Sequence, residues 1–133
     1  DRSSAASDVY KRQKSGDMAP VSMLDARGII GPVRVKGTGP CPMCAHLHRI
    51  DADEQWHEVA QRASEASRPG DPVTRTAVVM HAVVTIRRLM GRPTPPGAPR
   101  TRPLAGELKE VDLYGVEQHR LVLEHPRCPY CRG

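Results

Sequence analysis

Four cysteines, arranged as two Cys-Pro-x-Cys pairs, are the residues of this sequence with the clearest capacity for chemistry. The first pair is Cys41-Pro-Met-Cys44 and the second is Cys128-Pro-Tyr-Cys131, and the chain of 133 residues contains no other cysteine. Such a pair can exchange disulfides as a redox dithiol, or it can supply two thiolates to a metal ion. The residues around each pair must decide between these two chemistries.

The surroundings of the second pair argue against a redox dithiol. A reactive thiol needs a lowered pKa, which usually comes from a helix N-terminus directly after the first cysteine. Only Arg132 and Gly133 follow Cys131, and two residues cannot form that helix. A thioredoxin-like fold would also place its dithiol after an early strand of the chain. We therefore set the redox interpretation aside.

Taken together, the two pairs predict a structural zinc site. Each pair can close a tight turn that directs two thiolates at one ion, and two such turns complete a tetrahedral site with Zn–S distances of about 2.3 Å. The expected ligands of one structural Zn²⁺ are Cys41, Cys44, Cys128 and Cys131. Four thiolates leave no position for water, so we do not expect zinc catalysis. Rubredoxin-like iron is the main competing metal.

Histidines beside the first pair provide an alternative ligand set. His46 and His48 follow Cys44, so that Cys-x-x-Cys-x-His-x-His could hold a metal by itself. The second cysteine pair makes this arrangement the less favoured one. His57 and His81 are interpreted as ordinary surface or packing residues. The sequence contains no Ser-His-Asp order, no G-x-G-x-x-G and no phosphate-binding loop, so it shows no catalytic constellation.

Strand-like segments are expected to deliver both cysteine pairs. Residues 26–40 read as a short strand with a kink at a Gly-Pro step, ending in a glycine-rich turn directly before the first pair. Residues 108–125 read as a β-hairpin whose second strand leads to the second pair. In that strand, Leu121 and Leu123 should point inward and alternate with outward residues.

Two main helices are predicted between the pairs. The first begins near Asp51, which with Glu54 forms a capping-box-like start, carries Trp56 on its apolar face and ends before Pro69. The second helix begins at Asp71, with a proline in its first turn.

This second helix should be heavily buried. It is apolar almost all round from residue 77 to residue 86 and stops at Gly91. Its polar residues fall on one narrow stripe: Thr74, His81, Thr85, Arg88 and Arg92. A helix of this kind is covered by protein on most sides, and we expect part of that cover to come from chain beyond this sequence. Its caps and its adjacent arginines argue against a membrane span.

Two segments are expected to lie outside the packed fold. Residues 91–103 are proline-rich and should form an extended, exposed connector. Residues 1–13 show no periodicity, and the stretch DVYKRQ looks like a translated sequencing-adapter sequence. We expect residues 1–13 to be non-native, residues 14–133 to belong to the protein, and its natural N-terminal part to precede Lys14.

Composition limits the class of protein without defining it. The chain has 13 Pro, 11 Gly, one Trp and no Phe, so its core is thin and a metal that closes the long loop between the pairs would help to stabilise it. The net charge of +5 comes mostly from scattered arginines, which indicates an arginine-rich composition more than a nucleic-acid surface. Without a signal peptide or a membrane span, the chain reads as cytoplasmic.

The motifs around the cysteines carry a family resemblance. The stretch GIIGPVRVKGTGPCPMCAHLHRIDADEQW (28–56) resembles ThiF-like proteins of azole and azoline peptide biosynthesis, in which a Gly-Pro strand and Cys-x-x-Cys precede Leu-His-Arg, an acidic run and Trp. The alanine- and valine-rich helix ending in Leu-Met-Gly and the HPRCPYC ending are similar to the same superfamily. The match covers residues 26–131. The Leu-His-Arg run favours the cyclodehydratase-partner branch over the ThiF and MoeB adenylating enzymes.

The resemblance implies an α/β fold, namely the C-terminal fragment of a ThiF-like fold with two main helices and a β-hairpin stapled by four-cysteine zinc. In that family, an upstream region binds the leader of a precursor peptide and presents the precursor to a YcaO-type ATP-dependent cyclodehydratase. The four cysteines carry over as zinc ligands, whereas residues for ATP or leader contact have no counterparts here. The implied partners are the precursor peptide and the cyclodehydratase, and a homodimer is compatible with the family.

Two other classes remain open on the sequence alone. The chain could be a fragment of an adenylating enzyme that activates a sulfur-carrier protein, which an intact upstream nucleotide loop would reveal. It could also be a zinc-ribbon module that binds nucleic acid, although exposed aromatic residues for base stacking are nearly absent. Whether the parent protein is itself an enzyme stays open.

Overall fold

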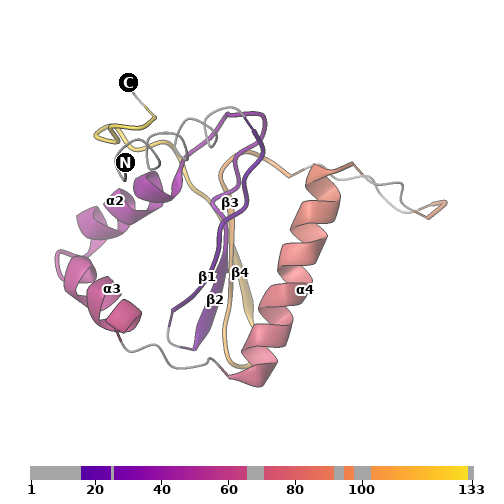
Figure 1. Ribbon diagram of the computed structural model, residues 1–133, viewed down its shortest axis with the longest axis horizontal. Helices are drawn as coiled ribbons and strands as arrows, with labels where there is room; N and C mark the ends of the chain where they lie inside the picture. Colours follow the sequence, from indigo (N-terminus) through magenta and orange to yellow (C-terminus); the bar gives the residue numbers. More distant parts are fainter. Residues whose placement is uncertain (1–15, 25, 66–70, 92–94, 98–102, 132–133) are drawn as a thin grey trace, which may run out of the picture.

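The computed structural model describes residues 16–24, 26–65, 71–91, 95–97 and 103–131. A four-stranded antiparallel sheet forms its centre (Figure 1). The strands are β1 (Val21–Leu24), β2 (Arg27–Ile30), β3 (Glu107–Val111) and β4 (Glu117–Leu121), and they lie in this order. Because β2 and β3 pair although they are distant in sequence, the sheet joins the two halves of the chain that carry the cysteines.

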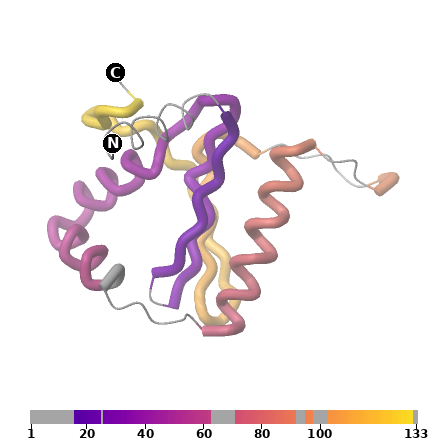
Figure 2. Tube along the Cα trace, in the orientation of Figure 1, coloured from indigo at the N-terminus to yellow at the C-terminus, as the bar shows by residue number. Residues whose placement is uncertain are grey.

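Helices lie on both sides of this sheet. Helix α4 (Pro72–Leu89) runs along one side and contacts mainly β2, whereas α2 (Pro42–Ala52) and α3 (Trp56–Glu65) lie on the other side (Figures 1 and 2). The predicted α/β class and the long second helix are therefore confirmed. The segment 1–13 and most of the connector lie outside the described residues.

The first predicted helix is corrected by the structure. Asp51 does not begin it but lies in the last turn of a separate helix, α2, which begins directly after Cys41 with Pro42 in its first turn. The chain then turns at Asp53, whose carboxylate accepts the backbone N–H of Gln55, before α3 begins. A proline at the first helical position favours this early start. This proline is part of the Cys-Pro-x-Cys pattern, which was interpreted only as a metal-binding turn.

The strand predictions are confirmed in outline and wrong in one detail. The kink falls at Gly31, whose φ of 108° suits glycine, and the hairpin forms between β3 and β4. The second strand, however, ends at Leu121, and the side chains of Leu121 and Leu123 are 56% and 69% exposed. They face outward because β4 is an edge strand of the sheet and the described chain packs little against it.

The small core lies between α4 and the sheet. Ile30, Val78 and Val111 form it, and they are almost fully buried. A Cβ added at Gly28 would lie 1.8 Å from a methyl group of Val78, so β2 and α4 approach each other closely where a side chain is missing. This contact fixes which side of α4 faces the sheet.

The side of α4 that faces the sheet is its polar stripe. Thr74, His81 and Thr85 are buried, and Val78 is buried beside them, while most of the large apolar residues of the helix are exposed. These exposed residues are Val73, Val79, Met80, Val83, Val84, Ile86 and Met90, and we call them the outer face of α4. The sequence predicted that most sides of this helix are covered, and within the described residues the apolar side is not. None of the described helices combines the length and apolarity that crossing a membrane would require.

Paired charges make the polar stripe compatible with burial. His81 lies 2.8 Å from a carboxylate oxygen of Glu117 through Nε2 and 3.1 Å from Nζ of Lys109 through Nδ1. An ammonium can only donate, so Nδ1 accepts and Nε2 donates its proton to Glu117. Burial lowers the pKa of His81, which agrees with this neutral form. Two turns further along the helix, both terminal nitrogens of Arg88 donate to the carboxylate of Glu107 in a bidentate ion pair.

Two adjacent valines of α4 provide a test of which side of the helix faces the sheet. Val78 is 4% exposed and Val79 is 62% exposed. We expect Val79→Glu to change the free energy of unfolding by no more than about 0.5 kcal/mol, as for other surface substitutions, and to reduce binding of a hydrophobic dye. Val78→Glu should cost about 3 kcal/mol or more, because it buries an unpaired charge. Chemical denaturation followed by circular dichroism measures both. Equal losses for the two variants would contradict this orientation of α4.

Candidate metal centre

The four cysteines, distant in sequence, meet at one end of the sheet. The Sγ atoms of Cys41 and Cys44 are 3.9 Å apart, those of Cys41 and Cys128 are 3.6 Å apart, and those of Cys44 and Cys131 are 3.5 Å apart. All four sulfur atoms lie within 4.8 Å of one another. A tetrahedral site with Zn–S bonds of 2.3 Å has sulfur–sulfur edges of about 3.8 Å. The cluster therefore has the dimensions of a tetrahedral metal site.

Local structure explains how each pair presents its sulfur atoms. Cys41 is the extended residue that precedes α2, and Cys44 follows in the first turn of the helix. The start of one helix therefore directs both side chains toward the sulfur cluster. Cys128 and Cys131 lie in the turn after the last strand, where the backbone N–H of Cys128 donates to the carbonyl of His125. Figure 1 shows this C-terminal turn beside the beginning of α2.

The protein environment opposes free thiolates at this centre. Burial raises the pKa of Cys41 to about 12, and burial also raises the pKa of Cys44. For Cys128, burial acts in the same direction, but the backbone N–H groups of Tyr130 and Cys131 and the thiols of Cys44 and Cys41 together outweigh it and lower the pKa. Buried cysteines with raised pKa values are poor redox nucleophiles. A bound cation would supply the charge that four neighbouring thiolates need.

Arg34 supports the centre from the glycine-rich turn. Its side chain is buried, donates to Sγ of Cys131 at 3.4 Å, and donates to the carbonyls of Gly37 and Gly39 at 2.6 and 2.7 Å. It thus ties the turn before the first cysteine pair to the second pair. Alternation along the strand gives no sign that this side chain points inward.

His125 and Asp51 form a second support. His125 is 2% exposed, and its Nε2 lies 2.7 Å from a carboxylate oxygen of Asp51 at the end of α2. Because Nδ1 accepts the backbone N–H of Arg127, Nε2 carries the proton and donates it to Asp51. This hydrogen bond is the main cause of the lowered pKa of Asp51. The His-Pro step before the second pair is the sequence signal for this contact.

The other histidines stay outside the sulfur cluster. His48 bonds to the carbonyl of Leu123 through Nε2 at 2.8 Å, and the ring of His46 lies edge-on to the ring of His57. The four cysteines are the one group of three or more potential metal ligands among the residues that the structure describes. The alternative Cys-x-x-Cys-x-His-x-His set is therefore wrong, because its histidines are engaged elsewhere. His81, interpreted as a surface or packing residue, belongs to the buried contacts of α4.

Two solved structures contain chains with a similar fold. The first, a heterocyclase in complex with substrate and cofactor, matches with a TM-score of 0.64 and 19% identity over 94% of this chain. The second, the E. coli microcin synthetase McbBCD complex, matches with a TM-score of 0.57 and 16% identity over 95% of this chain. The chain spans only 18% and 48% of the lengths of these two neighbours.

The similarity to known proteins is visible in the fold and not in the sequence. No profile of a known protein family matches the sequence, and no curated protein matches it either. The likeness therefore establishes a shared fold. That fold agrees with the predicted resemblance to proteins of azole and azoline peptide biosynthesis.

Arg34 provides a test of how the centre is supported. We expect Arg34→Met to lower the free energy of unfolding by about 2 kcal/mol or more, because it removes charge-assisted hydrogen bonds to the buried carbonyl of Gly39 and the half-buried carbonyl of Gly37. Arg34→Lys should rescue little of this loss, since one ammonium cannot reproduce the planar fork of a guanidinium. Urea denaturation of the metal-loaded chain measures the effect. The matched control is Arg62→Met on the exposed side of α3, and a comparable loss there would refute a specific role for Arg34.

Proposed function

We propose that residues 14–133 are the zinc-bearing part of a cytoplasmic protein of azole and azoline peptide biosynthesis. The whole protein would bind the leader of a precursor peptide and present the precursor to a YcaO-type cyclodehydratase. The observation that carries this proposal is the sulfur cluster within a fold shared with chains of a heterocyclase and a microcin synthetase complex. The chain itself supplies a structural element rather than the catalytic groups.

The proposed ion is Zn²⁺, held by Cys41, Cys44, Cys128 and Cys131. The sulfur–sulfur distances fit a tetrahedron, and an all-sulfur site suits zinc. The ion would bind four thiolates and leave no open position, so its role is to hold the turn at the end of the chain against the start of α2. Arg34 adds a positive neighbour that offsets part of the negative charge of such a site.

The outer face of α4 supports a place within a larger protein. Six large apolar residues of α4, and Met90 directly after it, are exposed, and an accumulation of apolar surface of this kind marks a surface that is covered by other protein. We propose that the remaining part of the parent protein covers it. Arg75 and Arg87 lie exposed near opposite ends of the helix, which carries no acidic residue. A covering surface with carboxylates at its rim would complement these charges, whereas two antiparallel copies of α4 would bring arginines together.

The zinc assignment is tested by removing half of the ligands. Replacing Cys128 and Cys131 with Ser should abolish stoichiometric zinc binding and unfold or aggregate the chain. Binding to structural zinc sites is worth on the order of 10 kcal/mol, comparable with the whole stability of a small domain. Metal analysis, X-ray absorption and thermal melting provide the measurements, and a strong chelator should reproduce the effect. A double variant that melts cooperatively within a few degrees of the parent chain would rule out the structural role.

The biosynthetic assignment is tested by reconstitution. We expect the complete parent protein, combined with a YcaO-type cyclodehydratase and precursor peptide from the same source, to support ATP-dependent ring formation. Mass spectrometry detects each ring as the loss of one water from the precursor. Omitting the parent protein, or deleting the leader of the precursor, should abolish the reaction. If instead the parent adenylates the C-terminus of a small carrier protein without any precursor peptide, the assignment is overturned.

A further inference from the structure

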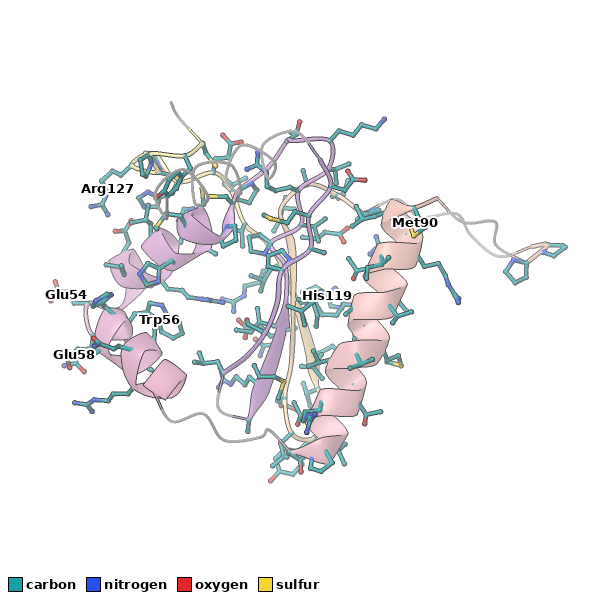
Figure 3. All side chains as sticks on the ribbon, viewed as in Figure 1. Glu54, Trp56, Glu58, Met90, His119 and Arg127 are labelled. Atoms are coloured by element: carbon teal, nitrogen blue, oxygen red, sulfur yellow. The ribbon has the colours of Figure 1, made fainter. Side chains whose placement is uncertain are left out.

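A cleft separates helices α2 and α3 from the face of the sheet opposite α4. It consists of two adjoining hollows of about 360 and 230 Å³, and Arg49 and Arg120 line both of them. One wall comes from α2 and the start of α3, and the other comes from the four strands and the two residues that follow β4. In Figure 3, Trp56 lies on the side of α3 that faces the sheet, while Glu54 and Glu58 point away from it. The cleft is not part of the sulfur cluster.

Positive charge exceeds negative charge along this cleft. Its charged lining residues are Arg27, Arg49 and Arg120 against Asp53 and Glu110. The carboxylate of Glu110 is buried and already paired with the guanidinium of Arg120. The carboxylate of Asp53 accepts a backbone N–H in the turn before α3. Both carboxylates are thus engaged, and two cations, Arg27 and Arg49, remain without an ion pair among the described residues.

Arg49 is the half-buried one of these two cations, whereas Arg27 is exposed. Among the described residues, Arg49 has no carboxylate partner within ion-pair distance, and its Cζ lies 5.0 Å from the centre of the Trp56 ring. Burial lowers the pKa of Arg49, Glu110 partly offsets this effect, and the nearby Arg120 adds to it. A guanidinium over an aromatic face keeps its in-plane N–H donors free for hydrogen bonds. A half-buried cation with unused donors calls for an anion.

Apolar side chains surround this cation. Those that line the two hollows are Leu24, Ile29, Ala45, Ala52, Leu108, Leu121, Val122 and Leu123. Leu121 and Leu123 are among the most exposed leucines of the chain, and they border the same space. A few polar groups within an apolar lining are the usual composition of a small-ligand site. An inorganic anion would use Arg49 but leave the leucines in water.

We propose that the cleft binds a carboxylate carried on an apolar group, with Arg49 donating hydrogen bonds to the carboxylate and Leu121 and Leu123 contacting the apolar group. An acidic side chain within an apolar peptide segment and a free carboxylic acid present this same chemistry. The site does not depend on the proposed biosynthetic function, because it rests only on the residues of the cleft.

The single tryptophan of the chain provides the readout. Trp56 lies under Arg49, so a carboxylate that binds Arg49 should change its fluorescence. The zinc-loaded chain is titrated with hexanoate and with the peptide N-acetyl-Leu-Glu-Leu-amide. Hexanamide and the Gln counterpart of the peptide are the uncharged controls. We expect a saturable change with at least one carboxylate probe and none with its uncharged control.

The probes also separate the two sources of the ligand. Saturation by the Glu peptide alone indicates a peptide site, and saturation by hexanoate alone indicates a site for a free acid. The proposal is overturned if neither carboxylate saturates, if inorganic phosphate binds as well as both carboxylates, or if the uncharged controls bind equally well.

Substitutions distinguish binding from a merely structural role of Arg49. Arg49→Gln should lower the affinity for the carboxylate probe by about tenfold or more, as expected for the loss of a charge-assisted hydrogen bond. The control variant Arg62→Gln, on the exposed side of α3, should leave this affinity unchanged. Glu110→Gln removes a negative charge that acts on Arg49 and releases Arg120 from its ion pair, so it should strengthen binding of the carboxylate. Circular dichroism confirms that each variant is folded. If Arg49→Gln does not fold, Glu110→Gln still tests the proposal. Unchanged or weaker binding of the carboxylate probe by that variant would refute it.

Discussion

The meeting of four sulfur atoms within 4.8 Å is the constraint on which the arrangement of this chain depends. Cys41 begins α2, and Cys128 follows the last strand, so their proximity fixes the helix against the turn at the other end of the sequence. The core between α4 and the sheet is small and does not touch α2. Without the sulfur cluster, α2 and α3 would be attached to the sheet mainly through side-chain contacts such as the one between His125 and Asp51.

Polar residues around the sulfur cluster hold the segments that carry the cysteines in place. Arg34 holds the glycine-rich turn by two carbonyls and reaches Cys131, while His125 connects the second pair to the end of α2. Hydrogen bonds of this kind orient metal ligands and restrict their motion. They also reduce the entropy that a metal would have to offset when it joins segments so far apart in sequence.

Features fixed by local chemistry could be predicted from the sequence, whereas features fixed by packing could not. The cap at Asp71, the stop at Gly91 and the kink at Gly31 follow from the conformations that these residues prefer, and the structure contains all three. The duplicated cysteine pattern likewise predicted the cluster. The inward direction of Arg34 and the outward direction of Leu121 depend on which segments lie across from them, and no local pattern carries that information.

Helix α4 shows why the number of apolar residues in a helix does not reveal which side of the helix is buried. The sheet beneath it presents Glu107, Lys109 and Glu117, and these charges are satisfied by His81 and Arg88 rather than by valines. A buried polar network is tolerated only when its members are paired, so the polar stripe must face the sheet and the apolar side must face away.

The two sides of the sheet consequently suit different kinds of partner. The outer face of α4 is broad and almost uncharged, which fits a surface that stays covered once the whole protein has folded. The cleft on the opposite side combines a half-buried cation with exposed leucines, which fits a ligand that enters and leaves. Because the sheet lies between them (Figure 1), covering α4 leaves the cleft open. Occupation of one side therefore does not by itself block the other.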